Sequence, residues 1–358
     1  MSVTFSGSRS KLNPYSAIGI NLAPGLGLEP RFQAPKARVL PIAPPRSGEL
    51  KCGPRSVANS RRSCSFTVKR RCERLKDFVM LRAGMKFEGR DLMSEKVDLY
   101  NNSYGNPGAD VHREIRTETY GQDFGQTSWT TSEELHEIPQ VLALSSASNV
   151  LEIGSGAGGC ALHVARALKC RVVGLDVNAE GVRQANQRAK ELRLDVLVRF
   201  EQADACQRMP FDDNSFDAAY SNDAVCHLAN RAGVLAELHR VLKPGGRLLF
   251  GDALVVTGLV TNEELATRSS IGYYVFAAPG QNEKLIAEAG MELLSATDTT
   301  TSAAAISKRW HDARAARSAS LIPIEGEANF AGLQKFLQCV HTLSTEKRLS
   351  RILYLARK

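Results

Sequence analysis

The fold is decided by a stretch that runs from Asn149-Val-Leu-Glu-Ile153 through Gly154-Ser-Gly-Ala-Gly-Gly159 to Cys160-Ala-Leu-His-Val-Ala-Arg-Ala-Leu168. The first part is short and apolar, the second is rich in glycine, and the third has the composition of a helix. A strand that ends in a glycine turn and continues as a helix lets a ligand approach the backbone closely. The stretch therefore predicts the first strand–turn–helix unit of an α/β domain.

Short apolar runs and amphipathic stretches keep alternating after this unit. We expect strands at about 171–175, 196–202, 216–220 and 246–251, and a helix over about 179–193. This order predicts a doubly wound, Rossmann-like parallel sheet with helices on both faces. In such sheets the ligand binds at the carboxyl ends of the strands.

The glycine turn fits two classes of cofactor. Gly154, Gly156 and Gly159 match the G-x-G-x-x-G fingerprint of dinucleotide-binding proteins, and Gly158 in place of Gly159 gives G-x-G-x-G. Asp176 ends the second predicted strand, where a carboxylate can accept hydrogen bonds from both hydroxyls of a ribose. An N-cap of the following helix is the alternative role for Asp176. These features leave both cofactor classes open.

Three further features separate the two classes. Glu152 is acidic within a largely apolar strand, where it can orient the ammonium group of a bound amino acid through the turn. Asp204-Ala205 ends the third predicted strand with a carboxylate suited to an adenine amino group, although a plain turn residue is the alternative. Phe216-Asp217 precedes Leu242-Lys-Pro-Gly-Gly246. We expect Asp217 to support the fold rather than the site.

Together these residues, in order over about 149–252, resemble the class I S-adenosylmethionine-dependent methyltransferases. The resemblance implies a seven-stranded sheet whose last strand is antiparallel, and Arg348–Ala356 alternates well enough to be that strand. It also implies S-adenosylmethionine as the cofactor, with the ribose on Asp176, the adenine on Val177 and its amino edge at Asp204 and Ala205. The implied cofactor-binding residues are Glu152, Gly154, Ser155, Gly156, Gly158, Asp176, Val177, Asp204, Ala205 and Asn222, with Gln126 and Trp129 from an upstream lid.

The segment Ser221–Leu228 resembles the acceptor side of phosphoethanolamine and sarcosine/dimethylglycine N-methyltransferases. Helical spacing would put Asp223 and His227 on one face. Asp223 could then bind an ammonium-like acceptor, and His227 could remove a proton near neutral pH. A packing or capping role is the alternative for His227, and we expect Cys226 to be a core thiol rather than a nucleophile.

Three segments outside the core unit bear on the acceptor. Residues 93–148 are expected to form a helical lid, in which Tyr120, Gln126 and Trp129 replace the usual pattern of these enzymes and leave the acceptor's identity open. Tyr120 is also a candidate catalytic residue. An insertion at about 255–280 is expected to wall the acceptor pocket. The basic stretch 303–318 is interpreted as a solvated helix face, with anion binding as the alternative.

The charge of the chain is divided unequally. The whole chain of 358 residues has a formal net charge of +8 and a pI near 9.1. Residues 1–92 carry 18 Lys and Arg against 6 Asp and Glu, so the remainder has a net charge of −4. The excess is thus confined to a proline-rich leader without periodicity, for which disorder is expected. An over-extended start before Met93, an organelle transit peptide and a functional basic tail are the three interpretations.

Composition excludes other classes of protein. No apolar run approaches the roughly 18 residues of a membrane helix, and the eight cysteines are not spaced for zinc. We therefore expect no metal, no membrane and no nucleic-acid partner, reduced thiols, and a cytoplasmic location, or an organelle if the leader is a transit peptide. The sequence does not indicate an oligomeric state.

These observations predict methyl transfer to a small-molecule acceptor, with an amine favoured. Three alternatives remain: a quinone- or phenol-like acceptor methylated at oxygen or carbon, RNA or protein as substrate, and a cofactor-binding regulatory protein without turnover. A nicotinamide-dependent dehydrogenase is disfavoured, because Glu152 and the Lys-Pro-Gly-Gly turn would have no role in it.

Overall fold

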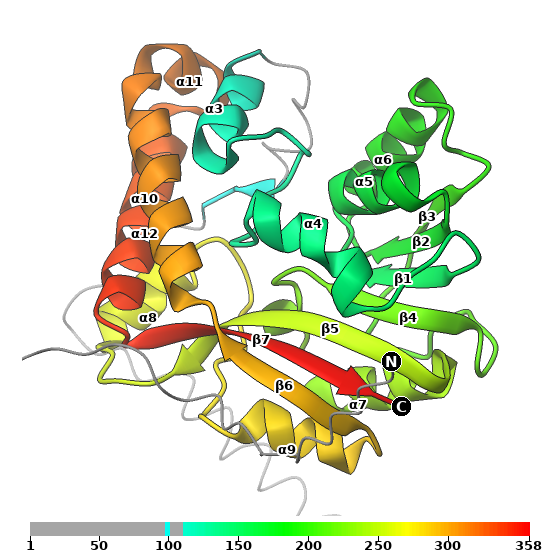
Figure 1. Ribbon diagram of the computed structural model, residues 1–358. Coiled ribbons are helices and arrows are strands. Elements are labelled where there is room, and N and C mark those ends of the chain that lie inside the picture. The colour runs from blue at the N-terminus through cyan, green and yellow to red at the C-terminus, as the bar shows by residue number, and fades with distance from the viewer. Residues whose placement is uncertain (1–96, 101–109) are drawn as a thin grey trace, which may run out of the picture. The chain divides into compact units, whose positions relative to one another are not determined.

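The computed structural model describes residues 97–100 and 110–358 (Figure 1). Within these ranges one seven-stranded sheet has the order β3-β2-β1-β4-β5-β7-β6. The predicted leader 1–92 lies outside the described residues. The strands are β1 (Asn149–Ile153), β2 (Arg171–Asp176), β3 (Val198–Gln202), β4 (Phe216–Ser221), β5 (Leu242–Val256), β6 (Glu292–Asp298) and β7 (Leu349–Arg357).

The sheet confirms the predicted topology. Strands β1 to β5 are parallel to one another, and β7 runs antiparallel between β5 and β6. The edge strand β6 was not expected, because its Glu-Leu-Leu-Ser-Ala-Thr-Asp sequence is exposed at every position and has no buried face to mark it. Asp217 supports the fold as predicted: its carboxylate accepts from the Asn149 amide at 2.8 Å and from Lys243 Nζ at 2.6 Å.

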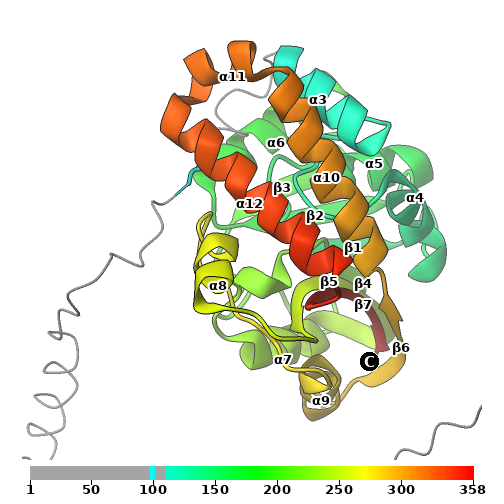
Figure 2. The ribbon, with the colours of Figure 1, turned by 90° about the vertical axis from the view of Figure 1, so that its left-hand side faces the viewer.

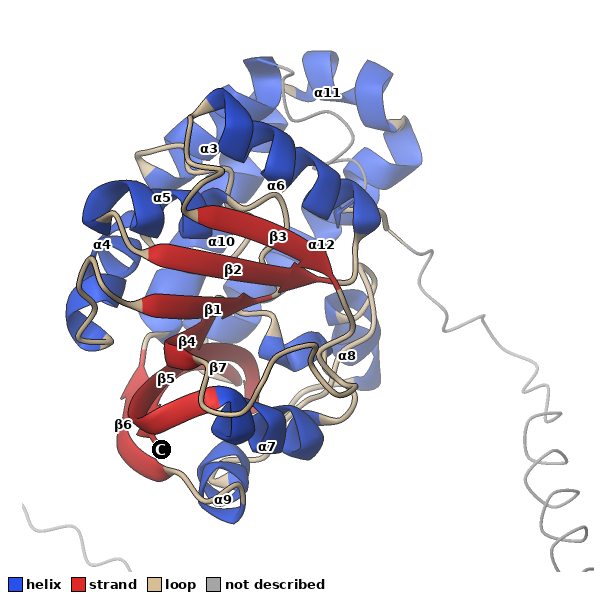
Figure 3. Ribbon diagram, turned by 90° about the vertical axis from the view of Figure 1, so that its right-hand side faces the viewer, coloured by secondary structure: helices blue, strands red, loops and turns tan. Residues whose placement is uncertain are grey.

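Helices cover both faces of the sheet (Figure 3). Alternate strand residues such as Val150 and Leu151 point to opposite faces, and each face buries its own apolar cluster. The helices α4 (Ser132–Val141), α5 (Gly159–Leu168) and α6 (Ala179–Glu191) pack on one face, and α7 (Arg231–Val241) and α9 (Gln281–Glu288) pack on the other.

A further helical layer stands beside the carboxyl ends of the strands (Figures 1 and 2). Its members are α3 (Asp110–Tyr120), α10 (Thr300–Ala316), α11 (Ser318–Glu325) and α12 (Glu327–Thr345). They share an apolar cluster in which the ring centroids of Trp129 and Trp310 lie 6.0 Å apart. The layer therefore anchors the segment that follows α3 over the sheet. Among the described helices, none is both long and apolar enough to cross a bilayer.

Candidate active site

A cavity of about 630 Å³ opens at the carboxyl ends of β1, β2 and β4. Its floor comes from the turn after β1 and from the ends of the neighbouring strands, as the sequence predicts. Its roof comes from residues 97–100, 125–129 and 271–274. The last of these ranges lies in the insertion predicted at 255–280, after the short helix α8 (Asn262–Arg268). In the described part of the chain, no group of His, Cys, Asp and Glu side chains could hold a metal ion.

The glycine turn holds its shape through the end of β2. The Gly154 and Ser155 amides donate to the Leu175 carbonyl at 2.8 and 3.1 Å, and the Gly156 amide donates to Asp176 Oδ2 at 2.8 Å. Gly154 has a φ of +72°, and a Cβ there would collide with Ala224 on the loop after β4. Only glycine therefore allows the turn and that loop to meet at the cavity.

Asp176 lines the cavity and is buried enough to raise its pKa. Its Oδ1 accepts from the Asn178 amide at 2.8 Å. The alternative role as helix cap is wrong, because the N-cap of α6 is Asn178, whose side chain accepts from the Gly181 amide. Asp176 is thus available to a ligand at the end of β2.

Glu152 is the most unusual carboxylate of the cavity. It is only 2% exposed, and burial raises its pKa to about 8 despite the Tyr220 hydroxyl and the Asn222 amide beside it. Asn222 Nδ2 donates to Oε1 at 3.4 Å, whereas Oε2 has no hydrogen-bond partner among the described residues. A buried carboxylate oxygen without a partner is costly. It therefore fits a site for a positively charged ligand group.

Two residues implied by the resemblance are placed elsewhere. Ala205 and Val177 line the cavity, but Asp204 does not. The Asp204 carboxylate accepts from the Cys206 amide at 2.8 Å, which is the turn role named as its alternative. Gly158 also lies outside the lining: it takes the left-handed conformation at the start of α5, with a φ of +78°, and faces Phe200.

His227 lies at the acceptor end of the cavity, in the 3₁₀ turn η1 (Val225–His227). Its Nδ1 is 2.9 Å from the Tyr273 carbonyl, which can only accept, so Nδ1 carries the proton. Nε2 then accepts from the Tyr100 hydroxyl at 2.9 Å. Burial lowers the pKa of His227, although the Tyr273 carbonyl opposes this shift. The imidazole is accordingly neutral at pH 7, with its Nε2 lone pair towards the Tyr100 hydroxyl, which also lines the cavity.

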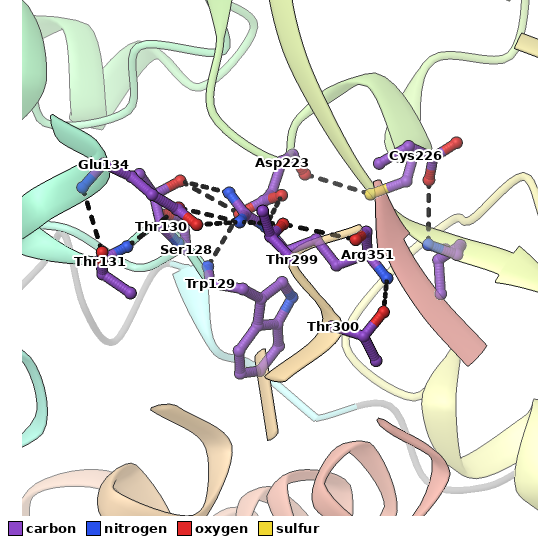
Figure 4. A network of polar contacts seen from close by, with 12 residues as sticks. Ser128, Trp129, Thr130, Thr131, Glu134, Asp223, Cys226, Thr299, Thr300 and Arg351 are labelled. Carbon is purple, nitrogen blue, oxygen red and sulfur yellow. Dashed lines mark hydrogen bonds and ion pairs between the residues drawn. The ribbon is translucent and has the colours of Figure 1, made fainter. Parts of the chain in front are cut away.

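Asp223 lines the same cavity, but its carboxylate is already paired (Figure 4). Oδ1 accepts from Arg351 Nε at 2.8 Å, and Oδ2 accepts from the Trp129 amide at 2.9 Å and from Thr130 Oγ1 at 3.3 Å. Asp223 has a φ of +57° and precedes a 3₁₀ turn rather than an α-helix. The expectation that helical spacing puts Asp223 and His227 on one face is therefore wrong.

Arg351 is the centre of this network and was not foreseen. It lies on β7, is 1% exposed, and donates from Nη1 to both Glu134 oxygens at 2.9 and 2.8 Å. Nη2 donates to Thr130 Oγ1 at 3.0 Å, and Nη1 also donates to Thr299 at 2.8 Å. One guanidinium thus joins β7, α4, the loop after β4 and the segment that carries Trp129. Tyr100 was missed as well, because 127 positions separate it from His227.

The lid residues divide between the cavity and the core. Trp129 and Gln126 line the cavity, although the Gln126 amide is bonded within the lid, to the Phe124 amide and the Gln122 carbonyl. Tyr120 does not reach the cavity. It is buried, and its hydroxyl donates to the Ser128 carbonyl at 2.8 Å. The prediction that Tyr120 faces the acceptor is wrong. Tyr120 instead supports the lid through its hydrogen bond to Ser128.

The basic stretch 303–318 forms most of α10, and none of its residues lines the cavity. Lys308 pairs with Asp312, Arg314 with Glu325, and Arg317 with Glu114 and Glu118. The interpretation as a solvated helix face holds only in part: Lys308 and its partner are exposed, whereas Trp310 and Arg314 are buried in the helical layer.

Known proteins share this architecture. Residues 151–250 match the family described as "Methyltransferase domain". The 27-O-demethylrifamycin SV methyltransferase of Amycolatopsis mediterranei is 29% identical over 205 residues, 54% of this chain and 75% of that protein. The sterol 24-C-methyltransferase ERG6B of Gibberella zeae is 33% identical over 150 residues, 42% of this chain and 38% of that protein. The phosphoethanolamine N-methyltransferase 2 of Haemonchus contortus, solved with phosphomonomethylethanolamine and S-adenosylhomocysteine, superposes with a TM-score of 0.61 at 19% identity, covering 76% of this chain and 61% of that chain.

The sheet order, the glycine turn and the acidic cavity define the class I methyltransferase fold. With the matched domain and relatives, they identify the chain as an S-adenosylmethionine-dependent methyltransferase. Its cofactor is S-adenosylmethionine. The unpartnered Glu152 oxygen and the Asp176 carboxylate are fitting hydrogen-bond acceptors for it. The similar proteins methylate oxygen, carbon and nitrogen according to their names, so they do not define the acceptor.

Proposed function

We propose that this methyltransferase acts on a hydroxyl group of a small, largely apolar molecule, with His227 as the group that takes the hydroxyl proton. The observation that carries the proposal is the neutral imidazole at the acceptor end. Its Nδ1 proton is held by the Tyr273 carbonyl, and its Nε2 lone pair accepts from the Tyr100 hydroxyl. A hydroxyl acceptor would pass its proton to Nε2 by taking the place of the Tyr100 hydroxyl or through it. A hydroxyl is a weak nucleophile and needs such a base.

The two ends of the cavity have separate tasks in this proposal. Glu152 would hold the ammonium group of the cofactor and Asp176 its ribose hydroxyls. When bound, S-adenosylmethionine supplies an electrophilic methyl group. Trp129 and the insertion residues 271–274 cover the acceptor end and exclude water from it. His227 meets the acceptor there, where burial keeps the imidazole uncharged.

An amine is the second candidate acceptor. It is favoured by the aromatic side chains that line the cavity, because ring faces attract a methylated cation. The argument from Asp223 for an amine is weaker, since Arg351 already neutralises that carboxylate. The aromatic side chains that line the cavity are Tyr100, Trp129, Tyr273 and Tyr274.

An acceptor screen with matched pairs tests the proposal. Each phenol or alcohol is offered beside the amine of the same carbon skeleton, with methyl-labelled S-adenosylmethionine, and the products are identified by mass spectrometry. We expect O-methylated products, and a loss of their formation in His227→Asn. Methylation confined to the amines, or binding of the cofactor without any turnover, would contradict the proposal.

A further inference from the structure

Arg268 is a buried cation that pairs with no carboxylate among residues 97–100 and 110–358. It is the last residue of α8, within the insertion, and is 1% exposed. The Tyr274 side chain is its hydrogen-bonding and electrostatic neighbour, yet Nη1 and Nη2 have no partner of good hydrogen-bond geometry among the described residues. Its guanidinium carbon lies 4.8 Å from the Tyr274 ring centroid, 5.1 Å from that of Phe336 and 5.7 Å from that of Trp129.

The other buried arginines of the described chain all have carboxylates. Arg351 pairs with Asp223 and Glu134, Arg231 pairs with Asp252 at 2.7 Å, and Arg314 pairs with Glu325. A buried charge that lacks a partner is strongly destabilising, and a cation–π contact offsets only part of that cost. The three rings therefore compensate Arg268 only in part, and its free N–H groups remain to be satisfied.

Arg268 lies next to the acceptor end of the cavity. Two of the rings over its guanidinium, Trp129 and Tyr274, line the cavity, and the Tyr274 ring centroid is 4.3 Å from that of His227. The guanidinium is thus one aromatic ring away from the imidazole. No Lys or Arg is among the described residues that line the cavity, so Arg268 is the nearby cation whose N–H groups are unfilled.

We propose that Arg268 binds an oxyanion on the acceptor, so that the acceptor is a small molecule with both a reacting hydroxyl and a carboxylate or phosphate group. A guanidinium offers paired N–H donors that match either group. The acceptor's anion would reach Arg268 past the Trp129 and Tyr274 rings and would satisfy Nη1 and Nη2. The inference rests on the proposed function in one respect, namely that the His227 end of the cavity holds the acceptor.

Calorimetric titration of the protein saturated with S-adenosylhomocysteine tests this inference without turnover. The probes are phenylacetate, phenyl phosphate and the neutral phenylacetamide, and the first two distinguish a carboxylate from a phosphate source. We expect at least one anion to bind roughly 10- to 100-fold more tightly than phenylacetamide, as charged hydrogen bonds provide. Arg268→Met should remove the preference, and Arg268→Lys should keep part of it. Equal binding of all three probes, or a preference that survives in Arg268→Met, would overturn the inference.

A control variant and a stability measurement separate binding from folding. Arg348→Met removes a guanidinium that pairs with Glu264 on the same helix, and it should leave the anion preference unchanged. Thermal unfolding should show Arg268→Met at least as stable as the unmodified protein without ligand, since an unpaired buried charge is removed. If Arg268 serves only to pack the three aromatic rings, Arg268→Met unfolds at a lower temperature than the unmodified protein, and Arg268→Lys binds the three probes without preference. Methylation of neutral hydroxyl compounds alone would overturn this inference and leave the proposed function intact.

Discussion

The cofactor end of the cavity and its acceptor end are built in different ways. Backbone amides and strand termini between β1 and β3 shape the cofactor end, where the Gly156 amide fixes Asp176. Side chains from distant segments shape the acceptor end, where Tyr100, His227 and Tyr273 meet through two hydrogen bonds. Arg351 and Asp223 hold the loop that carries His227 to β7, α4 and the segment that carries Trp129. Substitutions at the first end should therefore change cofactor affinity, and substitutions at the second should change turnover.

His227→Asn should have the largest effect on turnover. Loss of a general base lowers kcat by roughly 10²- to 10⁴-fold, while the dissociation constant for S-adenosylmethionine should stay the same, because Glu152 and Asp176 remain. Single-turnover kinetics and calorimetry measure the two quantities. His239→Asn on α7 is the matched control. Turnover within about threefold of the unmodified enzyme would remove His227 from the chemistry.

Arg351→Met should have the largest effect on stability. It leaves the buried Asp223 and Glu134 carboxylates without their cation, which costs about 3–5 kcal/mol in the free energy of unfolding. The loss should be smaller at pH 5 than at pH 8, because burial raises the pKa of Glu134 and its protonation removes one of the unpaired charges. Denaturant titration measures it, and Arg183→Met, which breaks an exposed pair with Glu180, should leave stability nearly unchanged. Equal effects of the two variants would contradict the account of the network.

Glu152→Gln should weaken cofactor binding by roughly 10- to 100-fold, because it removes the charge that faces the cofactor's ammonium group. The pKa of Glu152 is about 8, so the carboxyl is largely protonated at pH 7 and must ionise to bind a cation. Affinity should therefore rise between pH 6 and pH 8, with release of a proton on binding. Calorimetry in buffers of different ionisation enthalpy measures that proton. A pH dependence that persists in Glu152→Gln would assign it to another group.

Tyr120→Phe should have the smallest effect. The hydroxyl donates to the Ser128 carbonyl inside the protein, so its removal should cost about 1 kcal/mol of stability. Because Tyr120 does not line the cavity, kcat should stay within about threefold. A loss of turnover comparable to that of His227→Asn would restore Tyr120 to the catalytic residues.

The contrast between the two ends also explains what the sequence could predict. At the cofactor end, Glu152, Gly154 and Asp176 lie within 25 residues, and strand–turn–helix patterns place them without knowledge of tertiary contacts. Their positions at the strand ends are confirmed. The prediction for Asp204 was wrong because its neighbour Ala205, and not Asp204, lines the cavity. A carboxylate in a turn and one that binds a ligand show the same local sequence pattern.

At the acceptor end, the decisive contacts join residues far apart in the chain. Arg351 meets Asp223 across 128 positions, and neither residue type nor spacing marks the pair. Tyr120 and Trp129 both looked like lid aromatics, and both rings pack near Trp310 on α10, yet only Trp129 lines the cavity. Local patterns carry no information on such packing, so the acceptor could not be defined from them.

The pH dependence of kcat/KM for the acceptor tests the central claim most directly, measured at saturating S-adenosylmethionine so that ionisation of Glu152 on cofactor binding does not contribute. With a hydroxyl acceptor from the screen, the rate should fall on acidification with an apparent pKa below the usual 6.5 of histidine, since burial lowers the pKa of His227. The acidic limb should be absent from the residual activity of His227→Asn. A limb that is the same in both proteins would contradict the assignment of His227 as the base.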